Sequence, residues 1–284
     1  LLAKVRLVLR KDFNFTQNPQ RKFAVDAVFS TQPLIFPKMG EGCEVSATMN
    51  CAKYIKQRST VYSVAGRGHT GKGIECEDIT YLAETPKIRF FGLADGQSGK
   101  RCCREGGRAV LAAVFQFVAS ADITQLIQYK YVDELQYKII SVIRDTIDRL
   151  AASGRMDRAE YASTLVAFAY DIWTGQYMLI HLGDGGIIGT KNDGEIQMLS
   201  SPENGLTASY TWLTTSHNAL FHLRIGFGRV QTYRRIMLIT DGATLFAHGR
   251  NIPENAKKLI SDGGGREIIS ELTGSNPVDD ASCI

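Results

Sequence analysis

Three aspartates in this sequence share one local setting, because each follows an apolar, strand-like run and precedes a glycine. They form the pairs Asp95-Gly96, Asp184-Gly185 and Asp241-Gly242. An Asp-Gly pair is a common turn, and each pair taken alone predicts no more than a turn. Three carboxylates delivered to strand ends can, however, gather around a cation at one edge of a sheet. The pairs Glu77-Asp78 and Asp279-Asp280 add further carboxylates to this set.

Oxygen ligands without nearby thiolate or imidazole favour magnesium or manganese over zinc. Two such ions can share a water, lower its pKa and hold the resulting hydroxide in line with a phosphorus atom, so that no protein nucleophile is needed. The five histidines show no metal-ligand spacing and are interpreted as structural or surface residues. They are His69, His181, His217, His222 and His248, of which His69 lies nearest the aspartate motifs.

Hydrophobic patterns predict the elements that position these side chains. The run KIRFFGLA predicts a buried strand that ends at Asp95, and helical spacing predicts helices at 105–120 and 134–154, the second with Leu135, Ile139, Ile143, Ile147 and Leu150 on one face. Strand-like runs follow at 163–171, 176–184, 186–191, 195–201 and 234–242, and two shorter helices are expected at 254–262 and 266–274. Strands and helices in separate blocks, with hairpins between the strands, predict an α+β fold with antiparallel sheets.

Composition limits the remaining possibilities. Hydrophobic residues at 44% and charged residues at 22% are typical of a soluble globular protein. The net charge of +4 comes without a basic stripe, so no nucleic-acid partner is expected. The longest apolar stretch, 109–119, is far short of the roughly 20 residues of a membrane span. Six cysteines without scaffold density favour a reducing, cytoplasmic setting.

Six motifs occur in an order and spacing that resemble the metal-dependent protein phosphatases of type 2C, with the bacterial branch nearest. They are GHTGKGIECED, FFGLADGQSGK, YASTLVAF, IHLGDGGIIG, IMLITDG and VDDAS. The resemblance runs from about Val61 to the last residue, so residues 57–284 are expected to form this domain and 1–56 an extension of unclear role. It implies two packed antiparallel sheets flanked by helices in a four-layer sandwich. It also implies hydrolysis of phosphoserine and phosphothreonine in signalling phosphoproteins at a binuclear magnesium or manganese site.

The resemblance also implies roles for individual residues. Asp95 matches the position that bridges both metals, and Gly96 matches the one that lends its backbone carbonyl. Asp241 and Asp279 match the other ligands of the first metal. Asp184 matches a position that, with Asp241, binds a third ion in the family.

Further residues match positions around these ligands. Asp78, beside Glu77, matches a residue that holds metal-bound water. Ser163 and Thr164 match a structural strand motif, which indicates packing rather than catalysis.

Two departures from the family pattern keep an alternative open. Gln97 stands where many members carry a histidine that protonates the leaving alkoxide, and glutamine cannot donate a proton in this way. Gly73 stands where many carry an arginine that grips the substrate phosphate. The adjacent Lys72 can supply charge there, but without the bidentate fork of arginine. A catalytically weak or inactive binding module on the same scaffold therefore remains an alternative.

Two motifs suggest other phosphate chemistry. Cys102 and Arg108 have the spacing of a cysteine-dependent phosphatase loop, although Glu105 occupies a place where glycine is needed for the backbone to curl around phosphate. This remains a lesser alternative. The string GRGHTGK resembles the start of a nucleotide-binding loop, but Gly73 replaces the required Ser or Thr, and a strand-like run follows.

Overall fold

The computed structural model describes residues 59–128, 132–204, 211–243 and 279–284, together with 257, 260, 261, 270, 271 and 277. The expected extension, residues 1–56, lies outside this part of the chain. The expected helices at 254–262 and 266–274 lie mostly outside it as well. The boundary at residue 56 therefore stays a prediction.

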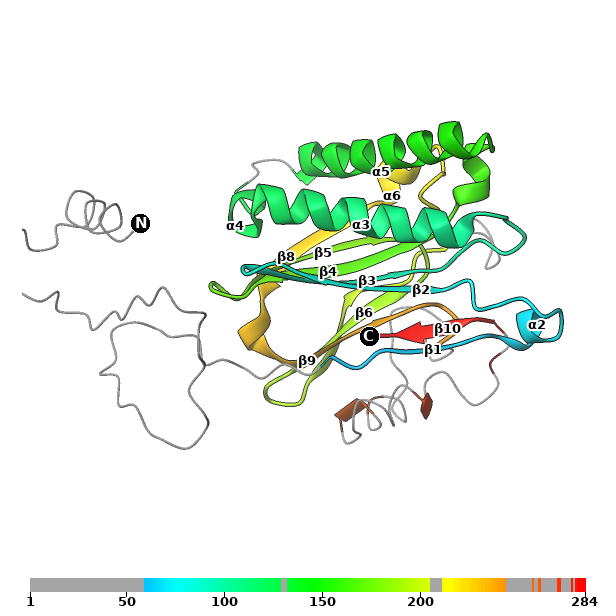
Figure 1. Cartoon of the computed structure of the whole chain (residues 1–284). Helices are drawn as coiled ribbons and strands as arrows, with labels where there is room; N and C mark the ends of the chain where they lie inside the picture. Colours follow the sequence, from blue (N-terminus) through cyan, green and yellow to red (C-terminus); the bar gives the residue numbers. More distant parts are fainter. Residues whose placement is uncertain are drawn as a thin grey trace, which may run out of the picture. The chain divides into compact units, whose positions relative to one another are not determined.

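Two antiparallel sheets of five strands each form the centre of the described part (Figure 1). The first has the order β2-β3-β4-β5-β8, with strands at Ile79–Glu84, Ile88–Ala94, Leu165–Asp171, Gln176–Leu182 and Arg224–Arg229. The second has the order β1-β10-β9-β6-β7, with strands at Tyr62–Val64, Ala281–Cys283, Tyr233–Ile239, Gly186–Lys191 and Ile196–Ser200. The predicted α+β class with antiparallel sheets is confirmed.

Helices α3 (Cys103–Ala121) and α5 (Val132–Gly154) cover the outer face of the first sheet (Figure 1). The face of α5 predicted from sequence packs inward: Leu135, Ile139, Ile143 and Ile147 are all buried. Short helices complete the described elements: α2 (Arg67–Thr70), α4 (Ile123–Leu126), η1 (Arg158–Tyr161), α6 (Ala219–His222) and η2 (Val230–Thr232).

Strand β4 is buried along its whole length because both of its faces are covered. Successive strand residues point to opposite faces of a sheet. Leu165, Ala167 and Ala169 pack into the cluster beneath the helices, whereas Val166 and Phe168 pack into the cluster between the two sheets. The first sheet is thus the buried middle layer, and it gives its neighbours a rigid support.

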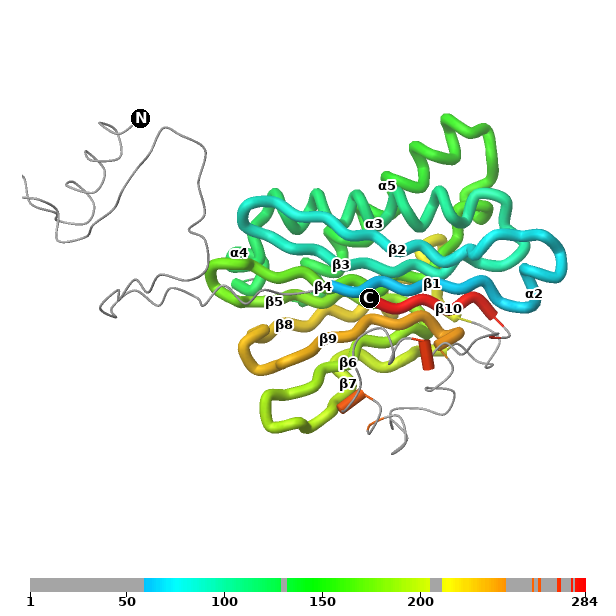
Figure 2. Tube along the Cα trace, turned by 60° about the horizontal axis from the view of Figure 1, so that its bottom comes forward, coloured from blue at the N-terminus to red at the C-terminus, as the bar shows by residue number. Residues whose placement is uncertain are grey.

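The second sheet joins segments from opposite ends of the described chain. Strand β10 lies between β1 and β9, with Tyr62 opposite Cys283 and Cys283 opposite Ile239 (Figure 2). The residues just before β10 are therefore held beside the ends of β9 and the start of the domain. No local pattern in the sequence predicts this strand order.

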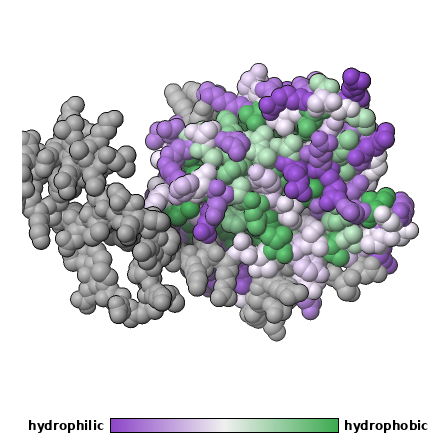
Figure 3. Space-filling model, viewed as in Figure 1, coloured by the Kyte–Doolittle hydropathy of each residue, from purple (hydrophilic) through white to green (hydrophobic). Residues whose placement is uncertain are grey.

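The face of the molecule seen in Figure 3 mixes hydrophilic and hydrophobic residues, with hydrophobic residues towards its middle. Such a mixture is ordinary, since apolar atoms contribute more than half of a folded protein's surface. In the described residues, no helix combines the length and the apolar character needed to cross a bilayer.

Candidate metal centre

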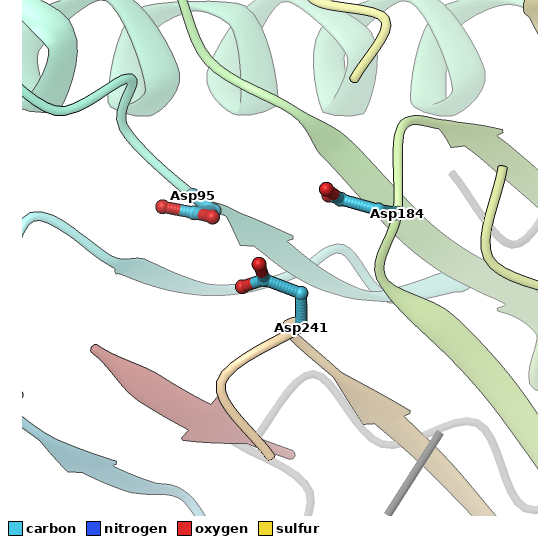
Figure 4. A group of neighbouring side chains, drawn as sticks. All are labelled: Asp95, Asp184 and Asp241. Carbon is cyan, nitrogen blue, oxygen red and sulfur yellow. The ribbon is translucent and has the colours of Figure 1, made fainter. Parts of the chain in front are cut away.

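Three aspartates from separate strands converge at one end of the two sheets. Asp95 follows β3, Asp184 lies in the turn between β5 and β6, and Asp241 follows β9 (Figure 4). One carboxylate oxygen of each lies within 4.8 Å of the others. The first sheet supplies Asp95 and the second supplies Asp241, so packing of one sheet on the other forms the cluster.

The glycines after Asp95 and Asp241 are required by close packing rather than by turn conformation. Neither Gly96 nor Gly242 has a positive φ. A Cβ atom on Gly96 would lie 2.8 Å from the Cys103 sulfur, and one on Gly242 would lie 1.9 Å from the Asp280 carbonyl oxygen. Glycine at these two positions therefore allows the Cys103 side chain and the Asp280 backbone to pack against the residues that follow Asp95 and Asp241, which the turn interpretation does not explain.

Burial and mutual repulsion disfavour the charged forms of the three carboxylates. Burial raises the pKa of Asp184 to about 7, and the charge of Asp241 adds to the effect. Burial likewise raises the pKa of Asp95 well above its usual range, with contributions from Asp78, Asp241, Asp184 and Asp279. Burial and then Asp279 raise the pKa of Asp241. A bound cation would relieve this repulsion.

Asp78 and Asp279 lie beside the cluster but outside its 4.8 Å group. Asp78 is buried, and its Oδ2 accepts a 2.9 Å hydrogen bond from the Thr240 hydroxyl. Burial raises its pKa to about 7. Asp279 is exposed, and its Oδ1 accepts a 2.9 Å hydrogen bond from the backbone N–H of Asp280. The charges of both help to raise the pKa of Asp95, and the bond to Thr240 holds Asp78 beside the residue that precedes Asp241.

The residues present fit hard divalent cations. The Oδ1 atoms of Asp78 and Asp184 are buried without a hydrogen-bond partner in the described residues. Buried polar atoms normally have partners, so each exception needs an explanation, and an ion or its water supplies one. All the candidate ligands are carboxylate or carbonyl oxygens, which suit magnesium and manganese.

Two acidic residues beside the expected site point to a different partner. Glu77 and Asp280 approach the imidazole of His69 rather than the three-aspartate group. Asp280 is buried and accepts hydrogen bonds from the backbone N–H groups of Gly66 and Glu77. The sequence offered no individual role for Asp280, which stood out only as the neighbour of Asp279 in an acidic pair.

The two departures from the family pattern lie in exposed backbone. Gly73 has φ of +69°, which favours glycine, so an arginine here would be strained. Lys72, the residue expected to replace that arginine, is exposed just after α2. Gln97 is also exposed, and its backbone N–H donates a 3.0 Å bond to the Ala162 carbonyl.

The cysteine-loop geometry is absent at Cys102 and Arg108. Helix α3 begins at Cys103, so Arg108 lies within a regular helix, where its side chain is exposed. A phosphate loop needs consecutive N–H groups turned inward, whereas helical N–H groups bond along the helix. Burial also raises the pKa of the neighbouring Cys103 thiol to about 11.

Gly106, which the cysteine-loop motif leaves unexplained, has a packing role. A Cβ atom there would lie 2.2 Å from the Tyr161 carbonyl oxygen. The glycine thus lets α3 approach η1 closely.

The nucleotide-loop motif also lacks its context, since α2 has only four residues and strand β2 is the next element.

Comparison with known proteins gives three results. The family model described as Protein phosphatase 2C matches residues 65–263, more than half of the chain. The structure resembles that of the Mycobacterium tuberculosis serine/threonine phosphatase PstP/Ppp at 17% identity and a TM-score of 0.54, covering 79% of this chain and 95% of that one. It also resembles the Staphylococcus aureus serine/threonine phosphatase Stp1 at 12% identity and a TM-score of 0.56, covering 79% and 92%.

A different kind of match covers a short stretch. Over 52 residues, 18% of this chain, the sequence is 81% identical to the tRNA threonylcarbamoyladenosine dehydratase of Haemophilus influenzae (strain ATCC 51907 / DSM 11121 / KW20 / Rd). The chain spans only 20% of the length of that protein. This partial match does not carry the dehydratase activity to the chain.

Proposed function

The chain belongs to the protein phosphatase 2C family, and we propose that it hydrolyses phosphoserine and phosphothreonine in proteins with two bound magnesium or manganese ions. The convergence of Asp95, Asp184 and Asp241 within 4.8 Å carries this proposal. Net hydrolysis breaks the bond between phosphorus and the serine or threonine oxygen, consumes one water and releases inorganic phosphate. When bound, the ions would supply a water of lowered pKa and would neutralise charge on the phosphoryl oxygens.

The proposed metal-binding roles of the residues follow from their positions in the fold. Asp95, the carbonyl of Gly96, Asp241 and Asp279 are proposed to hold the two ions, and Asp184 with Asp241 a third. The oxygens come from strand ends of two packed sheets, so their positions are fixed before substrate binds. Asp95 and Asp184 are partly buried, which strengthens their electrostatic interactions relative to those in bulk water.

Residues at the rim are proposed to handle substrate and solvent. The unpartnered Oδ1 of Asp78 can orient a water beside the ions, with Glu77 next to it. Lys72 is exposed after α2 and can attract the substrate phosphate as a point charge. The four described cysteines that are free thiols, Cys76, Cys102, Cys103 and Cys283, support a reducing, cytoplasmic setting.

A manganese-dependent assay on a phosphoserine peptide tests the proposal. Asp241→Ala should lower kcat/KM about 1,000-fold, because a metal ion contributes several kcal/mol and each 1.4 kcal/mol corresponds to about tenfold in rate. Asp145→Ala is the matched control, since Asp145 is an exposed carboxylate on α5. Activity that survives both EDTA and Asp241→Ala would count decisively against the proposal.

The alternative of an inactive binding module rests on Gln97 and Gly73. It predicts that wild-type protein shows no turnover of any phosphopeptide and no manganese binding by calorimetry. Turnover that EDTA abolishes would exclude it.

A further inference from the structure

The two acidic pairs that flank the candidate metal centre are each divided between two environments. Asp78 accepts a hydrogen bond from Thr240, the residue before Asp241, and the charges of Asp78 and Asp279 both raise the pKa of Asp95. Their neighbours Glu77 and Asp280 lie against His69 instead. His69 is therefore the side chain that contacts one member of each pair, Glu77 and Asp280.

His69 is buried between these two carboxylates. Its residue is 9% exposed, its Nδ1 lies 2.9 Å from Oδ2 of Asp280, and its Nε2 lies 3.3 Å from Oε2 of Glu77. In the part of the chain that the structure describes, no other basic side chain forms an ion pair with either carboxylate. His69 is therefore the side chain that lies within ion-pair distance of both buried acids.

Asp280 links His69 to the backbone of two other segments. Its Oδ1 accepts a 2.7 Å hydrogen bond from the N–H of Gly66, and its Oδ2 accepts one from the N–H of Glu77. Gly66 precedes α2, Glu77 precedes β2, and Asp280 precedes β10. The contact at the His69 Nδ1 therefore acts on a carboxylate that joins three chain segments.

A further segment of the chain approaches Nε2, the other ring nitrogen of His69. The Ser98 hydroxyl lies 3.5 Å from Nε2 of His69, in the loop that follows Asp95 and Gly96. His69 therefore contacts side chains from every segment that delivers a carboxylate to the centre except those of Asp184 and Asp241. It does not itself belong to the three-aspartate group.

We propose that His69 is a positioning residue of the metal centre, which pairs with Glu77 and Asp280 and so fixes the backbone that presents Asp78 and Asp279. This inference rests on the proposed function, because it assigns His69 to the support of the same site. A histidine that merely fills space in the core would stabilise the fold without affecting ion affinity. The two roles are therefore distinguished by metal binding rather than by stability.

The test is calorimetric titration of the full chain with manganese, applied to wild type, His69→Ala, His69→Asn and His69→Gln. The asparagine amide can replace the ring nitrogen that faces Asp280, and the glutamine amide can replace the one that faces Glu77. Loss of a residue that supports metal ligands typically costs 10- to 100-fold in metal affinity. We expect His69→Ala and His69→Gln to bind manganese at least about tenfold more weakly, and His69→Asn to stay within about threefold of wild type, because the Asp280 contact is the shorter.

Asp280→Asn completes a double-mutant cycle. If His69 acts through Asp280, His69→Ala should weaken manganese binding less in the Asp280→Asn variant than in the wild type. We expect the loss of affinity, in log units, to be less than about half as large in that variant. His217→Ala is the matched control, since His217 is an exposed histidine, and it should leave manganese affinity unchanged. Near-UV circular dichroism reports which variants are folded. If His69→Ala is not folded, the manganese affinities of His69→Asn and His69→Gln are compared with each other instead.

Two results would overturn the inference in different ways. Wild-type affinity in folded His69→Ala or His69→Gln, with a lowered unfolding temperature, would show a structural histidine only and would leave the proposed function intact. Absence of manganese binding by the wild type would overturn the proposed function and the inference together.

Discussion

The backbone N–H of Asp95 donates a 2.9 Å hydrogen bond to the Thr164 hydroxyl, and the N–H of Thr164 returns a 2.8 Å bond to the Asp95 carbonyl oxygen. This reciprocal pair extends the pairing of β3 and β4 beyond the last residue of β3. Gly96 then forms an isolated bridge with Ser163. The carboxylate at the strand end is therefore held by its own backbone before any ion binds.

Replacing Thr164 with valine should weaken the metal centre, since valine keeps the shape but removes the acceptor for the Asp95 N–H. An unsatisfied buried donor costs about 1–3 kcal/mol, and we expect that loss in the free energy of unfolding measured with urea. Displacement of Asp95 should also lower kcat/KM about tenfold. Thr164→Ser should retain both properties.

Thr146→Val provides the control for that prediction. Thr146 is also buried, but its hydroxyl donates a 2.8 Å bond to the Val142 carbonyl within α5, remote in sequence from every aspartate of the centre. Its replacement should change stability without changing kcat/KM. An equal loss of activity in the two valine variants would contradict the role assigned to Thr164.

Asp184→Asn should stabilise the metal-free protein. Burial and the charge of Asp241 raise the pKa of Asp184 to about 7, so at pH 8 the carboxylate is ionised in the folded state at a free-energy cost that the unfolded chain does not bear. Asparagine removes the charge, and in EDTA at pH 8 the gain should be about 1 kcal/mol, or about 2–4 °C in the unfolding midpoint. Differential scanning calorimetry measures it. A lowered midpoint in EDTA would show that repulsion is not the dominant effect at this position.

Acid should destabilise the protein through His181. Burial and then the charge of Arg224 lower the pKa of His181 well below its usual value, while its Nδ1 lies 2.7 Å from the Ser200 hydroxyl. The unfolded chain takes up a proton near pH 6.5 and the folded protein only at lower pH, so the free energy of unfolding decreases as pH falls below about 6.5.

His181→Asn removes this proton uptake and keeps a polar atom opposite Ser200. In urea unfolding between pH 5 and 8, the variant should lose stability less steeply, by up to about 1.4 kcal/mol per pH unit below pH 6. His217→Asn, at an exposed position, should follow the wild-type slope. Parallel slopes for wild type and His181→Asn would show that His181 does not cause the loss of stability in acid.

Cys102 should be dispensable for turnover. Because Arg108 lies within α3 and faces solvent, the two residues cannot form a phosphate loop. Cys102 is partly buried against the core and lies outside the three-aspartate group, so we expect Cys102→Ser to keep kcat/KM within about twofold even if stability falls. Iodoacetamide should likewise leave wild-type activity unchanged. Complete loss of activity in Cys102→Ser would restore the cysteine mechanism.

The sequence by itself predicted both long helices and most of the strands, although not β1, β8 or β10, and it indicated the chemical type of the site. Apolar runs located β3, β4, β5 and β9, and helical spacing located α3 and α5 with the correct inward face of α5. These features are local, because hydrophobic periodicity is set by neighbours a few residues apart. Aspartates at strand ends without nearby thiolates indicated oxygen-bound divalent ions for the same local reason.

Only the tertiary structure decided which carboxylates meet. Asp78 and Glu77 are adjacent in the sequence, as are Asp279 and Asp280, yet Glu77 and Asp280 lie against His69, whereas Asp78 bonds to Thr240 beside Asp241 and Asp279 is exposed. Adjacent residues at the end of a strand point in different directions, and what each one meets depends on segments about two hundred positions away. The sequence alone does not predict which member of each pair meets His69, because the packing of β10 between β1 and β9 brings these distant segments together.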